Sequence, residues 1–175
     1  GCVTLDMLGK GGETGAFKYS TASAHLLSAV LSRTTGKSAR EFANEMLFRP
    51  IGMRSIPDYP MDGFGYEDLF GAKLKGWPHD PHGITTGGWG LTMTPRDMAR
   101  FGLLYLNSGC WDGNEILPQS WVRASAAANP HQYGYMWWLF QEKGISAFAA
   151  MGDGGNAIFC IPQLDMVAAI ASAFI

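Results

Sequence analysis

The stretch that decides the fold is Phe17 to Leu27, FKYSTASAHLL, because it places a tyrosine at the entrance of a helix. Tyr19 is followed by Ser20 and Thr21, which are residue types that cap helix N-termini. The helix is predicted from apolar residues that recur at helical spacing, namely Leu26, Leu27, Val30 and Leu31. A phenol at a helix entrance is a candidate general base. Spacing alone favours the alternative, a half-buried aromatic residue that staples the helix start.

A second helix is predicted from Ser38 to about Leu47. Gly36 supplies the stop for the first helix, and Ser38 with Glu41 three residues later forms a capping box. Pro50 forbids continuation of the second helix.

The segment from Ile51 to Gly83 is broken by prolines and glycines and carries interspersed aromatic residues. A compact domain rarely holds so long an irregular segment unless it covers a binding site, so we expect it to form one rim of a pocket. The HDPH group, His79 to His82, has metal-binding residue types. Pro81 bends it and no third ligand cluster follows, so a surface turn is the better interpretation and no metal site is predicted.

The second half of the chain changes from helical to strand periodicity. Thr94, Pro95 and Asp97 predict a helix start, and the helix ends near Asn107. A further helical patch is predicted from Gln119 to about Ala127. Four short β-type runs then follow, YMWWLF, AFAAM, AIFCI and MVAAIASAFI, separated by turns. Helices first and consecutive strands last predict an α+β fold with helices packed on an antiparallel sheet.

Length and composition indicate one domain spanning residues 1–175. The chain is 47% hydrophobic and 16% charged, which suits a single buried core. The net charge of -2 leaves no basic patch, so we expect no nucleic-acid partner. No apolar run approaches the roughly 18 residues of a spanning helix, and we expect no membrane span. Three widely separated cysteines argue against a disulfide framework and a CxxC metal site. The sequence assigns no compartment.

Three blocks carry a resemblance to a known family. They run from Glu13 to Met53, from Thr85 to Gly109, TTGGWGLTMTPRDMARFGLLYLNSG, and from Met151 to Ile170, MGDGGNAIFCIPQLDMVAAI. In this order they resemble the serine β-lactamase and penicillin-binding-protein-like superfamily, in its esterase and 6-aminohexanoate-dimer-hydrolase branch. The resemblance implies a β-lactamase/transpeptidase-like fold.

The resemblance also implies a nucleophilic serine in a Ser-x-x-Lys helical turn that precedes the tyrosine motif. No serine among these 175 residues is followed three positions later by lysine. We therefore expect the chain to be a fragment, incomplete at its N-terminus and lacking the nucleophile segment, so that alone it is inactive.

Residue roles implied by the resemblance fall at three places. Tyr19 would be the general base for the serine and the acid for the leaving group. Thr21 stands where the family often has an asparagine that positions substrate, and Trp89 would line the pocket wall. The third motif falls on Asp153, Gly154 and Gly155, and the backbone N–H of Asn156 would be one of two donors to the oxyanion. Without the family match, these glycines indicate a flexible hairpin turn.

Asp153 is the departure with the most chemical content, since the family carries lysine or histidine there. A carboxylate would repel a substrate carboxylate, so we expect neutral esters or amides, or substrates with an amine, to be preferred.

Two other kinds of site, a dinucleotide site and a GxSxG nucleophile elbow, have little support in the sequence. GDGGNA, from Gly152 to Ala157, fits a loose dinucleotide pattern, but a strand rather than a helix is predicted to follow it. No GxSxG elbow surrounds any serine.

The sequence thus predicts a serine hydrolase that cleaves esters or amides through an acyl-enzyme and needs no cofactor. The alternative is a non-catalytic β-lactamase-like binding domain or an inactive remnant. We further expect self-association through an apolar groove that the absent nucleophile helix would otherwise fill.

Overall fold

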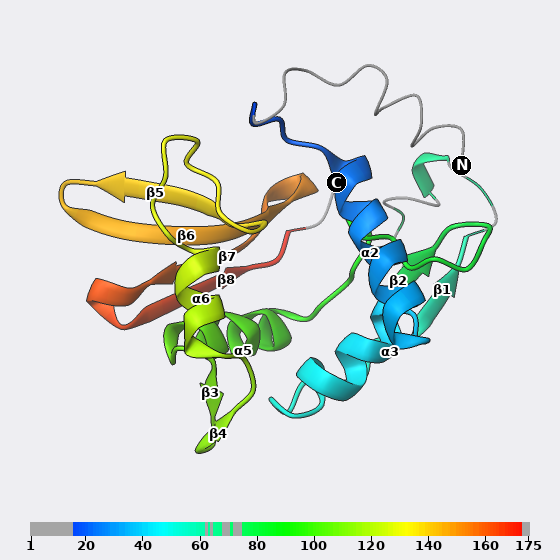
Figure 1. Ribbon diagram of the computed structural model, residues 1–175, viewed down its shortest axis with the longest axis horizontal. Coiled ribbons are helices and arrows are strands. Elements are labelled where there is room, and N and C mark those ends of the chain that lie inside the picture. The colour runs from blue at the N-terminus through cyan, green and yellow to red at the C-terminus, as the bar shows by residue number, and fades with distance from the viewer. Residues whose placement is uncertain (1–15, 62, 64, 68–70, 72–74, 173–175) are drawn as a thin grey trace. The chain divides into compact units, whose positions relative to one another are not determined.

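The computed structural model describes residues 16–61, 63, 65–67, 71 and 75–172 (Figure 1). These residues form two compact units. The first unit holds the described residues of 1–42 and 57–92, and the second holds those of 43–56 and 93–175. The expectation of a single domain over residues 1–175 stays a prediction.

Helix α2, Thr21–Thr35, dominates the first unit and begins where the sequence predicts it. The Ser20 side chain accepts a hydrogen bond from the Ser23 N–H at 3.2 Å, which caps the helix N-terminus. The helix ends at Gly36, whose φ of 70° is the left-handed conformation that glycine adopts readily.

The capping box before the second helix is confirmed. The Ser38 N–H donates to Glu41 Oε2 at 2.9 Å, and the Glu41 N–H donates to Ser38 Oγ at 3.2 Å. The α-helix α3, Ala39–Ala43, is short and gives way to a π-helix, η1, Asn44–Phe48.

Two short parallel strands lie in the segment that was predicted to be irregular. Strand β1, Asp58–Pro60, pairs with β2, Trp77–His79, in the register Asp58 to Trp77. The side chains of both strands contribute little apolar periodicity, which is why the sequence did not reveal them.

The second unit is built from helices and an antiparallel sheet. Helix α5, Pro95–Leu106, starts at the Thr94 cap, and α6, Gln119–Ser125, follows a small hairpin of β3, Cys110–Trp111, and β4, Asn114–Glu115. The sheet has the order β5-β6-β7-β8, with each neighbouring pair antiparallel. Its strands are β5, Trp138–Glu142, β6, Ile145–Gly152, β7, Asn156–Ile161, and β8, Met166–Ile170.

One face of this sheet packs on α5, which crosses β7 and β8 (Figure 1). The close approach depends on Gly102, because a Cβ there would lie 2.6 Å from Val167 Cγ1 and 2.9 Å from Ile158 Cγ2. The buried cluster contains Met98, Tyr105, Val122, Trp137, Phe148, Ile158 and Cys160. The predicted α+β class, with helices packed on an antiparallel sheet, is confirmed.

Candidate active site

Tyr19 lies immediately before the N-cap of α2, and about half of its surface is exposed. The aligned peptide dipoles of a helix favour negative charge at this end, and the first turn of α2 contains no acidic residue. Tyr19 therefore stands next to the electropositive end of the helix. Its exposure is also that of a half-buried residue, so both predicted roles, general base and staple, stay open.

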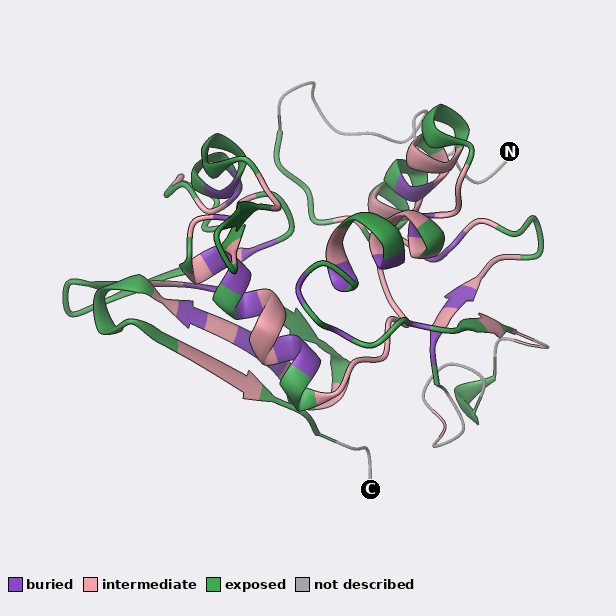
Figure 2. Cartoon of the chain, turned by 90° about the horizontal axis from the view of Figure 1, so that it is seen from below, coloured by how far each residue is buried: buried purple, intermediate pink, exposed green. Residues whose placement is uncertain are grey.

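The buried side of α2 is made of small and polar residues rather than the apolar series. Ser28 is buried and its hydroxyl donates to the Thr85 carbonyl at 2.6 Å. One turn earlier, His25 Nε2 lies 3.2 Å from Asp80 Oδ2. Leu26, Leu27 and Val30 are exposed instead. Figure 2 shows, in green, that exposed residues lie on helices as well as in loops. Two side-chain hydrogen bonds, from Ser28 to Thr85 and between His25 and Asp80, therefore connect residues 80–85 to α2.

Asp80 also organises the turn that follows it. Its Oδ1 accepts hydrogen bonds from the backbone N–H groups of His82 and Ile84, each at 2.9 Å. Partial burial raises the pKa of Asp80, but the hydrogen bonds from Ile84 and His25 outweigh burial and leave this pKa lowered. The HDPH segment was predicted to be a surface turn, and in it Asp80 accepts these backbone hydrogen bonds.

Trp89 and Thr21 belong to the same unit as Tyr19. Thr21 is the first residue of α2 and is exposed, whereas Trp89 is half-buried and its carbonyl accepts a hydrogen bond from the Thr86 hydroxyl at 2.7 Å. The structure brings Thr21 next to the segment that carries Trp89, because the Gly88 backbone lies against it.

Asp153, Gly154 and Gly155 form a short 3-10 turn, η2, that joins β6 to β7 in the second unit. Gly154 and Gly155 have φ values of 75° and 84°, which residues other than glycine rarely adopt. The Asn156 side chain closes the turn, since its Nδ2 donates to the Asp153 carbonyl at 2.7 Å. Its Oδ1 accepts from the Ser172 N–H at 3.0 Å.

The seven predicted site residues thus fall into two sets, one in each unit. Tyr19, Thr21 and Trp89 form the first set, and residues 153–156 form the second. The strand that follows the glycines is β7, as expected, so the turn lacks the helix N-terminus that a dinucleotide site requires.

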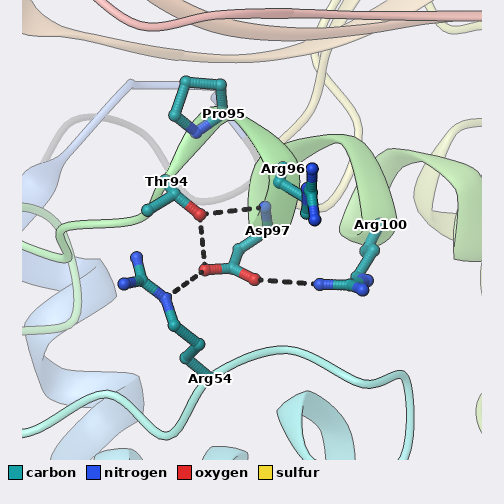
Figure 3. Close-up of a pocket in the computed structure, with 6 residues that line it drawn as sticks. All are labelled: Arg54, Thr94, Pro95, Arg96, Asp97 and Arg100. Atoms are coloured by element: carbon teal, nitrogen blue, oxygen red, sulfur yellow. Dashed lines mark hydrogen bonds and ion pairs between the residues drawn. The ribbon is translucent and has the colours of Figure 1, made fainter.

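A separate charged cluster surrounds the buried carboxylate of Asp97 at the start of α5 (Figure 3). Asp97 Oδ2 accepts from the Thr94 hydroxyl at 2.6 Å and lies 3.4 Å from Arg54 Nε, while Oδ1 lies 3.5 Å from Arg100 Nη1. Burial raises the pKa of Asp97, but the hydrogen bonds from Thr94 and Arg54 leave it lowered. The adjoining hollow of about 540 Å³ is lined by these residues, Pro95 and Arg96. The carboxylate is satisfied by the protein itself, so we assign the cluster a structural role.

Sequence reasoning missed the contacts that hold these segments together. His25 to Asp80, Ser28 to Thr85 and Arg54 to Asp97 join residues more than forty positions apart, and no local pattern marks such pairs. The adjacent glycines of GGWG were the one available signal, because paired glycines often mark a close backbone approach.

Within the described residues, no group of three or more His, Cys, Asp or Glu side chains could hold a metal ion. The helices of that same part of the chain are too short or too polar to cross a membrane.

Comparison with known proteins decides the family. The family model described as Beta-lactamase matches residues 13–173, which is nearly the whole chain. The protein belongs to the beta-lactamase family. The predicted membership of the serine β-lactamase and penicillin-binding-protein superfamily is confirmed.

The relatives of this beta-lactamase-family chain include 6-aminohexanoate-dimer hydrolases. The 6-aminohexanoate-dimer hydrolase of Paenarthrobacter ureafaciens is 24% identical over 172 residues, covering 89% of this chain and 39% of the relative. A solved structure from Bacillus anthracis, provisionally assigned as a 6-aminohexanoate-dimer hydrolase, is 27% identical with a TM-score of 0.72. It covers 96% of this chain and 42% of that protein.

A penicillin-binding-protein homologue from Caulobacter crescentus shares the fold, with a TM-score of 0.54 and 17% identity over 87% of this chain and 51% of its own. The chain spans about two fifths of the length of the 6-aminohexanoate-dimer hydrolases that it matches.

Proposed function

We propose that the protein contributes the base and part of the oxyanion site to a serine hydrolase that cleaves neutral esters or amides through an acyl-enzyme. The observation that carries the proposal is the position of Tyr19, an exposed phenol directly before the N-cap of α2, in a chain of the beta-lactamase family.

The reaction would proceed in two proton-balanced halves. The ionised Tyr19 oxygen takes the serine proton as the serine oxygen bonds to the substrate carbonyl carbon. The protonated phenol then gives that proton to the leaving alcohol or amine as the carbonyl–leaving-group bond breaks. Water releases the acyl group in a second cycle of the same steps.

The backbone N–H of Asn156 would be one donor to the negative oxygen that develops on the carbonyl. Support comes from the turn that precedes it, because two glycines with positive φ and the Asn156 side-chain bond fix the backbone there. Donors held in place before the reaction stabilise developing charge most effectively.

The nucleophile is proposed to come from outside these 175 residues, which contain no Ser-x-x-Lys. Trp89 would form a wall of the acyl pocket and Thr21 would contact the substrate. Asp153 is exposed, and its charge would disfavour substrates that carry a carboxylate.

The test uses the complete gene product with p-nitrophenyl butyrate as a neutral ester. We expect Tyr19→Phe to lower kcat by about a hundredfold or more, since general base catalysis contributes roughly that much. Tyr135→Phe is the matched control, because Tyr135 is equally exposed and lies outside the proposed site. Equal rates for the wild type and Tyr19→Phe would refute the role of Tyr19.

The second candidate is a non-catalytic binding domain or inactive remnant, which the absence of Ser-x-x-Lys within these residues favours. It predicts that the complete gene product forms no covalent adduct with a fluorophosphonate probe. An adduct detected by mass spectrometry would exclude it.

A further inference from the structure

The first two glycines of GGWG, Gly87 and Gly88, lie directly on the first two turns of α2. A Cβ built on Gly87 would lie 2.1 Å from the Ala24 carbonyl oxygen and 2.9 Å from His25 Cα. A Cβ on Gly88 would lie 2.6 Å from Thr21 Cγ2 and 2.8 Å from the Thr21 carbonyl oxygen. Neither position has room for a side chain.

The need for glycine here is one of space rather than of backbone angle. Neither Gly87 nor Gly88 has a positive φ, whereas Gly83 in the same segment has a φ of 77° and nothing within 4 Å of its Cβ position. The obstacles at Gly87 are main-chain atoms of a helix, which cannot rotate aside as a side chain can.

The contacted residues form one stripe of α2. Thr21, Ala24, His25 and Ser28 recur at the i, i+3, i+4 and i+7 spacing of a single helix face. On this same face Ser28 hydrogen-bonds to Thr85 and His25 to Asp80. Residues 85–88 therefore follow α2 from Ser28 back to Thr21.

The segment therefore ends at the candidate site. Trp89 follows Gly88 directly, and Tyr19 stands two residues before Thr21. We propose that Gly87 and Gly88 are positioning residues, which set the separation between Tyr19 and Trp89 by bringing two backbones into contact. This inference rests on the proposed function for its catalytic consequence, and its structural content is independent of it.

A positioning role for Gly87 and Gly88 differs from a purely structural role in its effect on the surroundings of Tyr19 and Trp89. A glycine that only stabilises the unit would change its stability and leave the surroundings of Tyr19 and Trp89 unchanged. A positioning glycine, when replaced by alanine, pushes the segment away from α2 and changes the environment of both aromatic rings. The two cases have different spectroscopic signatures.

The experiment is fluorine NMR of the 175-residue chain labelled with 3-fluorotyrosine or 5-fluorotryptophan. The Tyr19 and Trp89 signals are assigned with Tyr19→Phe and Trp89→Phe. We expect Gly87→Ala to shift both signals and to leave Tyr105 and Trp137 in the second unit in place. Gly83→Ala is the matched control, because it places an alanine at a strained φ in the same segment without touching α2.

Ser28→Ala is the second variant, in case Gly87→Ala does not fold. It removes the hydrogen bond to Thr85 without adding an atom, and we expect a smaller shift of the same two signals. Unchanged Tyr19 and Trp89 signals in every folded variant of this pair would overturn the inference.

In the complete gene product, Gly87→Ala should lower kcat for a neutral ester by about a hundredfold with KM changed less than about threefold, as a misplaced base would. A wild type that hydrolyses nothing counts against the proposed function, and the NMR result still decides the positioning role.

Discussion

At the residue scale, the buried carboxylate of Asp97 illustrates how one side chain joins two parts of the second unit. It accepts a hydrogen bond from the hydroxyl of Thr94, the cap of its own helix, and another from Arg54, which follows η1 in the chain. The side chain of Asp97 is almost fully buried, but that of Arg54 is largely exposed, so solvent partly screens their interaction.

Replacement of Asp97 by asparagine should lower the free energy of unfolding by about 2 to 3 kcal/mol at neutral pH. The uncharged amide cannot balance the positive charges of the two neighbouring guanidinium groups. Urea denaturation followed by circular dichroism measures this loss. Asp112→Asn, at an exposed turn, is the control and should change stability little. A loss no larger than that of the control would contradict the structural role.

The same carboxylate gives a pH dependence whose sign follows from its lowered pKa. Its ionised form adds stability above the ordinary aspartate pKa of about 3.9, and this contribution disappears as the pH falls through the lower folded-state pKa. The stability difference between the wild type and Asp97→Asn should therefore shrink on acidification. A difference that stays constant down to about pH 3 would show that charge is not its source.

Asp153 allows a prediction about substrate charge. In the complete gene product, Asp153→Lys should raise kcat/KM for a hemisuccinate ester relative to a neutral ester of the same alcohol, since a repulsive charge becomes attractive. Competition assays at low salt give the ratio directly. Asp165→Lys is the control for net charge, because Asp165 is also exposed and lies in the turn between β7 and β8. An equal change of this kcat/KM ratio in both variants would show that Asp153 does not contact the substrate.

At the element scale, the packing of α5 on the sheet depends on a missing side chain. Alanine at position 102 would favour the helix by up to about 1 kcal/mol, but it would also force Val167 and Ile158 apart, at a cost of about 1 to 3 kcal/mol.

We therefore expect Gly102→Ala to destabilise the second unit by about 1 kcal/mol or more. Gly152→Ala is the control, because its Cβ would meet nothing closer than 3.7 Å. Thermal unfolding of both variants provides the measurement. A Gly102→Ala variant more stable than the wild type would mean that helix propensity outweighs the crowding.

At the scale of the whole molecule, both units leave large apolar side chains in contact with solvent. Helix α2 exposes Leu26, Leu27 and Val30. The sheet exposes Phe140, Met151, Met166 and Ile170. Contiguous apolar patches larger than a few hundred Å² are uncommon on soluble monomers unless they serve an interaction.

The 175-residue chain should consequently self-associate and bind a hydrophobic dye, as measured by sedimentation velocity and fluorescence. Leu27→Lys combined with Val30→Glu should reduce both signals. Ala22→Lys adds a charge at an exposed position of the same helix and serves as the control. A wild type that sediments as a monomer without dye binding would refute the expectation.

Much of the fold could be predicted because its signals are local. The caps at Ser20, Ser38 and Thr94 depend on neighbours three residues away, and all three form as expected. Tight turns between the last strands follow equally from residues such as Lys143 and Gly144, both with positive φ.

The remainder depends on contacts that no local pattern encodes. The parallel pairing of β1 with β2 joins residues 58 and 77. On α2, the buried face is the one whose Ser28 hydrogen-bonds to Thr85, not the one that carries the apolar series. For the candidate site, the sequence pointed to Tyr19 and the glycine turn, but the contacts of Gly87 with Ala24 and of Gly88 with Thr21 join residues more than sixty positions apart.

The position of Cys160 has one further consequence. Strand β7 is paired on both sides, and the thiol lies fully buried between it and α5, where burial raises its pKa to about 12. An alkylating reagent reaches this sulfur only when the sheet parts from the helix, whereas Cys110 is exposed and reacts at once. We therefore expect Cys160 to be alkylated much more slowly than Cys110, at a rate that measures how often the second unit opens.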